Sequence, residues 1–304
     1  MQPIRTIGLF VGPRVRIFLG PFYFVLDFLV LSCLDSILLK TNHKGRGINK
    51  KKIVKVHKTR MRILKSIFIW IAGVILTMAA FLASLFLKIL LAPFSIRDKM
   101  VHAQCFWWAD SLIALNPYWK LKVEGLENID YAQTYVIVAN HQSLADITVI
   151  YKTHMYFKWV AKKSLLKLPF IGGLLWVNNH VLLSRGEFGS IKFVYRQAAD
   201  WLRRGVSMLF FPEGTRSGTD EINEFQNGAF KLAIKEGRPL LPIFIGGTRE
   251  AIPKGGWIFK TQVFGKLVVL SPIDTTKYKA ADYAVLRDLV RGRFQALSLI
   301  RDPD

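Results

Sequence analysis

His141 and Asp146 are the residues of this sequence whose types and spacing best fit acid–base chemistry. They belong to the stretch Asn-His-Gln-Ser-Leu-Ala-Asp at 140–146, which follows an apolar run and precedes a predicted helix. On one continuous helix, five residues would separate the two side chains by about 140°, so they would not face each other. They can meet if His141 lies in the loop and Asp146 in the first helical turn. Ser143 favours that placement, because a serine followed by an acid three residues later is typical of a helix start.

A histidine oriented by an aspartate is a general base for a hydroxyl nucleophile. The simpler interpretation is a helix-capping aspartate beside a loop histidine, and the pair alone leaves both interpretations open. The sequence holds no G-x-S-x-G motif, which would place a serine nucleophile on a strand-to-helix turn. An attacking hydroxyl is therefore expected to belong to the substrate.

A second candidate stretch is Phe-Pro-Glu-Gly-Thr-Arg-Ser at 211–217, which ends an apolar run. Gly214 frees the backbone, Thr215 offers a hydroxyl and Arg216 offers a guanidinium fork. Such a combination suits a phosphate group. An ordinary polar turn is the alternative, and this stretch by itself does not decide between them.

The elements that would position these residues begin at about residue 100, where strand-like and helix-like patterns alternate. This alternation predicts an α/β fold with a largely parallel central sheet flanked by helices. The predicted strands are Tyr135–Ala139, Val181–Leu183, Ser207–Phe211, Leu240–Ile245 and Val263–Leu270, and the predicted helices are Ser190–Arg204, Asn227–Glu236 and Ala280–Leu299.

The chain before residue 100 is apolar and basic. Ile67–Leu87 is a run of 21 residues without a charge, which as a helix would be about 30 Å long and would match the core of a bilayer. Ile17–Leu39 is also hydrophobic, but Asp27 and Asp35 interrupt it, so we expect an interfacial or re-entrant segment there. These two segments predict an N-terminal membrane-embedded helical region. A buried core helix is the alternative for Ile67–Leu87.

Positive charge predicts an anionic partner. The chain carries 43 Lys and Arg against 21 Asp and Glu, a net charge of +22. The segment Lys40–Lys65 is rich in basic residues and lies between the two hydrophobic segments, which favours anionic membrane lipids over nucleic acid. Because this basic cluster favours the cytoplasm, a helix that crosses the membrane would put the rest of the chain outside. Either the helices dip into one leaflet without crossing the membrane, or the charge rule does not hold for this chain, and we expect the dip.

Cysteine and the other histidines offer no further site. Cys33 and Cys105 form no metal-ligand pattern, and a disulfide framework is not expected at this count. No metal site is predicted, and a reducing, cytosol-facing location is expected. His102, His154 and His180 lack the context of His141 and are expected to be structural.

The two stretches at 140–146 and 211–217 together resemble the glycerolipid acyltransferase family, specifically its 1-acylglycerol-3-phosphate acyltransferases. Their order and approximate spacing are similar to those of the family. Further similar segments are Ala161–Leu165, Leu182–Arg185 and Leu241–Ile243, and the resemblance covers about residues 61–290. Two positions depart from the family pattern: Ser184 stands where an acid is frequent, and Gln226 where a lysine is usual.

The resemblance implies transfer of a fatty acyl chain from a thioester to the sn-2 hydroxyl of lysophosphatidic acid, giving phosphatidic acid in phospholipid biosynthesis. His141 would take the acceptor proton, Asp146 would hold the imidazole tautomer, and backbone N–H groups near Gly214 would stabilise the oxyanion. No acyl-enzyme and no cofactor is implied, because acyl-CoA or acyl carrier protein is a co-substrate. The residues implied for the acceptor phosphate are Lys162, Arg185, Glu213, Gly214, Thr215 and Arg216.

Alternatives remain open at this point. A member of the same family could act on glycerol 3-phosphate, another lysophospholipid or a lyso-aminolipid. A protein of another class, a basic membrane-binding protein without catalysis, is disfavoured by the intact His141 and Asp146. The arginines implied for phosphate binding favour lysophosphatidic acid over uncharged acceptors.

Three regions are expected. Residues 1–60 form a basic extension with a hydrophobic segment, residues 61–97 a membrane-anchoring helix, and residues 98–304 the acyltransferase domain. We hypothesise that residues 1–60 are dispensable for catalysis and that Met61 is a natural start. The expected location is a membrane with the active site on its cytoplasmic face, and a bacterial inner membrane in particular.

Overall fold

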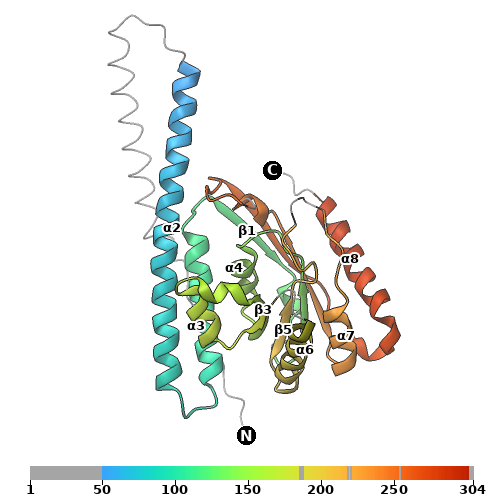
Figure 1. The fold of residues 1–304 in the computed structure, drawn as a ribbon. Helices are drawn as coiled ribbons and strands as arrows, with labels where there is room; N and C mark the ends of the chain where they lie inside the picture. Colours follow the sequence, from blue (N-terminus) through green and yellow to red (C-terminus); the bar gives the residue numbers. More distant parts are fainter. Residues whose placement is uncertain (1–49, 185–187, 218, 220, 253–254, 301–304) are drawn as a thin grey trace, which may run out of the picture.

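A computed structural model describes residues 50–184, 188–217, 219, 221–252 and 255–300, which form one sheet with helices on both of its faces (Figure 1). The sheet has seven strands in the order β1-β7-β6-β2-β5-β3-β4. Their bounds are β1 Trp119–Glu124, β2 Val136–Ala139, β3 Phe157–Lys162, β4 Val181–Leu183, β5 Ser207–Phe210, β6 Leu240–Gly246 and β7 Val263–Val269.

Strand directions confirm the largely parallel sheet. The strands β6, β2, β5, β3 and β4 all run in one direction, while β7 pairs antiparallel with β6 and β1 runs parallel to β7. The five strands predicted from the sequence are all present. Two others, β1 and β3, were not predicted, because charged residues interrupt their apolar runs: Lys120 and Lys122 in β1, and Lys158 in β3.

Each face of the sheet has its own apolar core. Ile137 and Ala139 of β2 pack on one side with α3 (Arg97–Ala114) and α4 (Asp146–Ile150). Val136 and Val138 pack on the other side with the remaining large helices. Those helices are α6 Phe188–Arg203, α7 Gly228–Glu236 and α8 Tyr283–Leu299, which confirm the three predicted helices. Burial on both faces explains why the central strands are apolar at every position.

The helix α2 (Lys50–Leu90) lies alongside α3 on the outside of the first layer (Figure 1). Its segment Lys58–Leu90 is long and apolar enough to cross a membrane. One side of α2 packs against the domain, and two hydrogen bonds hold it there. Trp108 Nε1 donates to Thr77 Oγ1 at 3.0 Å. Lys88 Nζ donates at 2.8 Å to the carbonyl of Val177, the last residue of α5 (Ile171–Val177). The buried residues on this side of the helix are Ser66, Ile69, Thr77, Ala80 and Ser84.

The opposite side of α2 is an apolar face open to the surroundings. Its exposed side chains are Leu64, Ile67, Trp70, Ile71, Val74, Ile75, Met78, Leu82, Phe86, Ile89 and Leu90. The helix runs through residues 60 and 61 without a break, so the expected regional boundary there does not coincide with the end of an element. The hydrophobic segment Ile17–Leu39 lies outside the described residues.

A buried lysine is an unusual feature of the interior. The Lys158 side chain is fully buried in β3, and its Nζ donates to the Asn178 carbonyl at 2.6 Å and lies 4.9 Å from the centre of the Tyr156 ring. Burial lowers the pKa of Lys158 from 10.5 to about 8. His102 and His180 are buried nearby. His102 Nε2 donates to the Met155 carbonyl, and His180 Nε2 accepts from Trp159 Nε1, so both bond within the core, as expected of structural histidines.

The buried ammonium predicts a pH dependence of stability that Lys158→Met removes. The folded-state pKa lies below the unfolded one, so the unfolded chain binds more protons between about pH 8 and pH 10.5, and the wild type gains stability as pH rises through that window. The full effect corresponds to about 3 kcal/mol. We expect the melting temperature of the wild type, relative to Lys158→Met, to rise between pH 7.5 and pH 9.5.

The exposed Lys192 provides the control, because Lys192→Met removes a lysine from solvent. Its melting-temperature difference from the wild type should be flat over the same range. A difference between wild type and Lys158→Met that is equally flat would contradict a neutral or weakly charged Lys158 in the folded core.

Candidate active site

The candidate residues gather at one edge of the sheet, beyond the carboxyl ends of the parallel strands. His141 follows β2, Phe211 follows β5 and Thr248 follows β6. Because β2 lies between β5 and β6 and all three run in the same direction, their following loops meet. The crevice beyond such strand ends is where open α/β sheets bind ligands.

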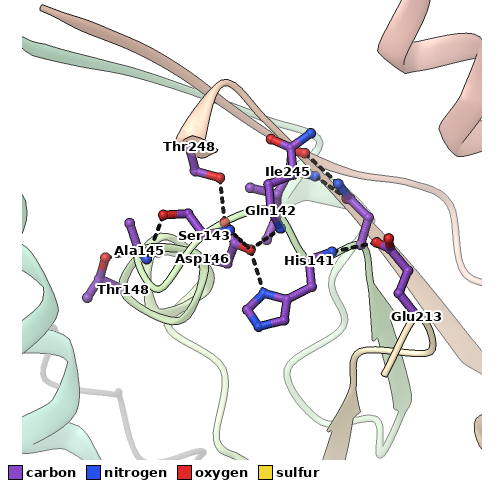
Figure 2. A network of polar contacts seen from close by, with 10 residues as sticks. His141, Gln142, Ser143, Ala145, Asp146, Thr148, Glu213, Ile245 and Thr248 are labelled. Carbon is purple, nitrogen blue, oxygen red and sulfur yellow. Dashed lines mark hydrogen bonds and ion pairs between the residues drawn. The ribbon is translucent and has the colours of Figure 1, made fainter. Parts of the chain in front are cut away.

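Asp146 is the centre of the arrangement (Figure 2). Its side chain is fully buried, and its Oδ2 accepts from His141 Nδ1 at 2.7 Å, from the Gln142 backbone N–H at 2.6 Å and from the Ser143 backbone N–H at 2.9 Å. Its Oδ1 accepts from the Thr248 hydroxyl. Both interpretations of Asp146 therefore hold, because the same carboxylate ties down the start of the helix and orients the histidine.

The helix start differs from the prediction by a few residues. α4 begins at Asp146, and Ser143 lies in the turn before it, where its Oγ accepts from the Ala145 N–H at 3.4 Å. The reason is that Asp146 reaches back to the N–H groups of Gln142 and Ser143 and so organises a tight turn ahead of the helix. This turn brings His141, five residues earlier, onto the carboxylate.

The backbone of His141 is fixed from both sides, and its ring is packed. Its N–H donates to Glu213 Oε1 at 2.7 Å, and its carbonyl accepts from the Ser217 N–H at 2.7 Å. The imidazole stacks on the Phe211 ring, with 4.2 Å between the ring centres. The side chain remains 20% exposed. With Nδ1 donating to Asp146, Nε2 is the ring nitrogen with a lone pair for an incoming proton.

Asn140 joins the loop to the neighbouring strand. Its buried amide donates to the Ile245 carbonyl at 2.7 Å and accepts from the Ile245 N–H at 2.7 Å. These two bonds continue the β2–β6 pairing by one residue beyond Ala139 and Ile243. The direction in which the chain leaves β2 toward His141 is thereby set.

Glu213 bonds to the backbone of the loop that carries His141. It is buried, with Oε1 on the His141 N–H and Oε2 on the Asn223 N–H at 3.3 Å. Burial raises the pKa of Glu213, and the two backbone N–H groups act against that rise. The carboxylate therefore faces the backbone of the loop that carries His141.

The other residues implied for a phosphate site lie near the same edge. Thr215 and Arg216 follow β5, Lys162 is the exposed last residue of β3, and these strands are neighbours. Gly214 has a φ of +69°, which favours glycine, but its N–H donates to the Phe211 carbonyl at 3.0 Å. That N–H is therefore engaged in the turn. Arg185 lies outside the described residues.

Metal ligation finds no support in the described part of the chain, where no group of three or more His, Cys, Asp or Glu side chains is placed to hold a metal ion. The charged groups at the edge are instead one histidine–aspartate pair, a buried glutamate and basic side chains.

Comparisons with known proteins agree with this arrangement. A family model described as Acyltransferase matches residues 120–246. The 1-acyl-sn-glycerol-3-phosphate acyltransferase of Haemophilus influenzae is 32% identical over 170 residues, which cover 54% of this chain and 69% of that protein. This chain belongs to that acyltransferase family. The matched residues contain both stretches, 140–146 and 211–217.

Two further similarities extend the family assignment. A chloroplastic 1-acyl-sn-glycerol-3-phosphate acyltransferase of Arabidopsis thaliana is 32% identical over 182 residues, covering 60% of this chain and 51% of that protein. The chain thus spans about half the length of this and two other plant and algal relatives that it matches. The crystal structure of the 1-acyl-sn-glycerophosphate acyltransferase from Thermotoga maritima superposes with a TM-score of 0.69 at 28% identity, over 81% of this acyltransferase chain and 99% of that one.

Thr248 is a residue of the site that sequence reasoning missed. It follows Gly247, whose φ of +72° and contact with the Phe264 carbonyl exclude a side chain there, and it begins the short helix η4 (Thr248–Glu250). Its hydroxyl closes the ring of donors around Asp146. The only signal in the sequence is the Gly-Gly-Thr step after the β6 strand, which predicts a turn but not its partner.

Removing this hydroxyl is predicted to lower both stability and acyl transfer. Thr248→Val keeps the shape of the side chain but leaves Asp146 Oδ1 without its donor. Hydrogen bonds to charged groups contribute about 1.5–3 kcal/mol to stability, so we expect a lower melting temperature, and we expect kcat to fall because the carboxylate that orients His141 is less firmly held. Thr248→Ser, which restores the hydroxyl, should recover most of the activity. An unchanged kcat in Thr248→Val would show that Asp146 does not need this donor.

Proposed function

We propose that this acyltransferase moves a fatty acyl group from acyl-CoA or acyl carrier protein to the sn-2 hydroxyl of lysophosphatidic acid, forming phosphatidic acid for phospholipid biosynthesis. The observation that carries the proposal is the His141 Nδ1–Asp146 Oδ2 hydrogen bond of 2.7 Å, which directs Nε2 of a partly exposed imidazole toward the strand-end edge. The names of the relatives support the choice of acceptor.

The proposed reaction needs one base and no covalent enzyme intermediate. Nε2 of His141 takes the proton of the acceptor hydroxyl as its oxygen forms a bond to the thioester carbonyl carbon. The imidazolium is stabilised by the Asp146 carboxylate. When the tetrahedral intermediate collapses, the C–S bond breaks and the thiolate leaves with the proton that His141 returns. Acid–base balance is thus restored within one turnover.

The acceptor phosphate is proposed to bind at the ends of the neighbouring strands β5 and β3. Lys162 is the last residue of β3, and Arg216 lies in the loop that follows β5, whereas Arg185 lies outside the described residues. Guanidinium groups suit phosphate because they present a planar fork of donors. Glu213 is assigned a different role, holding the His141 backbone in place.

The membrane arrangement is proposed from the way α2 is docked. A helix that crossed a bilayer alone would expose its whole circumference to lipid, but α2 packs one side against the domain between Ser66 and Lys88. Crossing would carry α3, with Arg97 and Asp98, into the hydrocarbon at high cost. The exposed face of α2 is therefore proposed to enter one leaflet, on the side of the membrane where the acyl thioester is present.

His141 is predicted to be essential for acyl transfer. His141→Ala should lower kcat by about 10²–10⁴-fold while the protein remains folded, because it removes the base. The measurement is a panel of acceptors with the purified chain and labelled acyl-CoA, and mass spectrometry of the product lipid. Lysophosphatidic acid should give the highest kcat/KM. More than half of the wild-type activity in His141→Ala, or a preference for glycerol 3-phosphate or a lyso-aminolipid, would contradict the mechanism or the acceptor.

Arg216 is predicted to act on the acceptor and not on the donor. Arg216→Ala should raise the KM for lysophosphatidic acid about 10–150-fold through the loss of charge-assisted hydrogen bonds, with a much smaller change for acyl-CoA. Arg216→Lys should restore only part of the loss, since an ammonium lacks the bidentate fork. The KM for each substrate, measured at saturation with the other, tests this, and equal effects on both substrates would remove Arg216 from the acceptor site.

A further inference from the structure

A small recess that is open to solvent lies between α2 and the starts of β1 and β7, and none of the residues already assigned to the catalytic site lines it. We call it the basic recess. Its polar lining consists of Arg62 and Lys65 from α2, Asn116 and Tyr118 from the connection between α3 and β1, and Lys260 and Thr261 ahead of β7.

The walls of the basic recess are held together by hydrogen bonds between segments far apart in the sequence. The Phe259 N–H donates to Ser66 Oγ at 2.9 Å, and Trp70 Nε1 donates to the Trp257 carbonyl at 2.8 Å, so the segment ahead of β7 is attached to α2. Asn116 Nδ2 donates to the Lys260 carbonyl at 3.2 Å. The basic side chains therefore project from a built frame.

The charge of the basic recess selects an anion. Arg62, Lys65 and Lys260 line it, and none of its lining residues is acidic. Glu250, outside the lining, forms an ion pair with Lys260 at 2.8 Å, and both side chains are about half exposed. An exposed pair of this kind contributes little and can be exchanged. A phosphate suits the site, because Arg, Lys and hydroxyl groups are its usual partners.

The position of the basic recess favours a lipid over a dissolved anion. The uncharged run of α2 begins at Ile67, two residues after Lys65. The exposed aromatic side chains Trp70, Tyr118 and Trp257 lie at the same level of the molecule, since they line the recess or bond across it. Basic residues followed by exposed Trp and Tyr at the start of an apolar helix are typical of the level of lipid headgroups.

The basic recess is also close to the catalytic edge without sharing residues with it. The short helix η4 donates through Thr248 to Asp146 and pairs through Glu250 with Lys260. The two sites thus lie on either side of one turn. A lipid bound at the recess would stand next to the place where the proposed reaction receives its acceptor.

We propose that the basic recess binds the phosphate of an anionic membrane phospholipid as a resident lipid, separate from the acceptor and the product of acyl transfer. Arg62 and Lys65 hold the phosphate, Lys260 turns to it from Glu250, and the acyl chains lie along the exposed apolar face of α2 beyond Ile67.

The test uses the full chain purified in a neutral detergent and titrated with fluorescent phosphatidylglycerol, with phosphatidylcholine as the probe without net charge. Arg62→Gln/Lys65→Gln should raise the Kd for phosphatidylglycerol at least about tenfold, as expected when charge-assisted hydrogen bonds are lost. The matched control is Lys58→Gln/Arg60→Gln, which removes the same charge from exposed positions of the same helix outside the recess. The control should change the Kd much less, and phosphatidylcholine binding should be equal in all three chains.

Equal losses in both double variants would show that diffuse charge attracts the lipid and would overturn the proposal, as would an unchanged Kd in Arg62→Gln/Lys65→Gln. Displacement of phosphatidylglycerol by inorganic phosphate at similar concentration would overturn the lipid assignment in favour of a free anion.

If the double variant has a much lower melting temperature than the wild type, a second variant is used. Thr261→Glu puts a negative charge at an exposed lining position and must weaken phosphatidylglycerol binding. Acyl transfer is measured on the same samples, so failure of the proposed enzyme function is seen separately.

Discussion

The buried carboxylate of Asp146 is the group on which the arrangement of the site depends. A charge in the interior is costly unless polar partners surround it, and this one receives two backbone N–H groups, an imidazole and a hydroxyl. The donors come from the loop after β2 and from η4 after β6. Satisfying the carboxylate therefore requires those two loops to be in place together, and the position of His141 follows from that requirement.

The sheet makes this convergence possible. The loops that follow parallel strands all begin at the same edge of the sheet, and β2 lies between β5 and β6. Asn140 bonds to β6 and Glu213 bonds to the His141 backbone, so both neighbours of β2 stabilise the same loop. The loop that carries His141 is thus fixed from both sides, while its imidazole remains 20% exposed.

Much of the fold and of the candidate site could be predicted from the sequence. The features that could not be predicted were missed for identifiable physical reasons. Five of the seven strands and three large helices follow from apolar runs and helical periodicity, and the meeting of His141 with Asp146 follows from the need for a turn between them. The strand β3 was missed because it buries a lysine, and no local pattern reveals that Lys158 finds the Asn178 carbonyl. Thr248 and Asn140 were missed because their partners are more than 100 residues away. Glu213 likewise bonds to a distant residue, the His141 N–H, and its motif neighbours Gly214, Thr215 and Arg216 give no sign of that partner.

The central claim is that Asp146 holds the neutral imidazole of His141 with its proton on Nδ1 and with Nε2 open to the acceptor hydroxyl. The most direct measurement is ¹⁵N NMR of the histidine side chains in the full chain, with the imidazole in its neutral form and the His141 signals identified by their loss in His141→Gln. The account predicts a single Nδ1–H tautomer in the wild type, and a shift toward Nε2–H in Asp146→Ala, which removes both carboxylate oxygens. A wild-type His141 that carries its proton on Nε2, or a tautomer that is the same in Asp146→Ala, would contradict it.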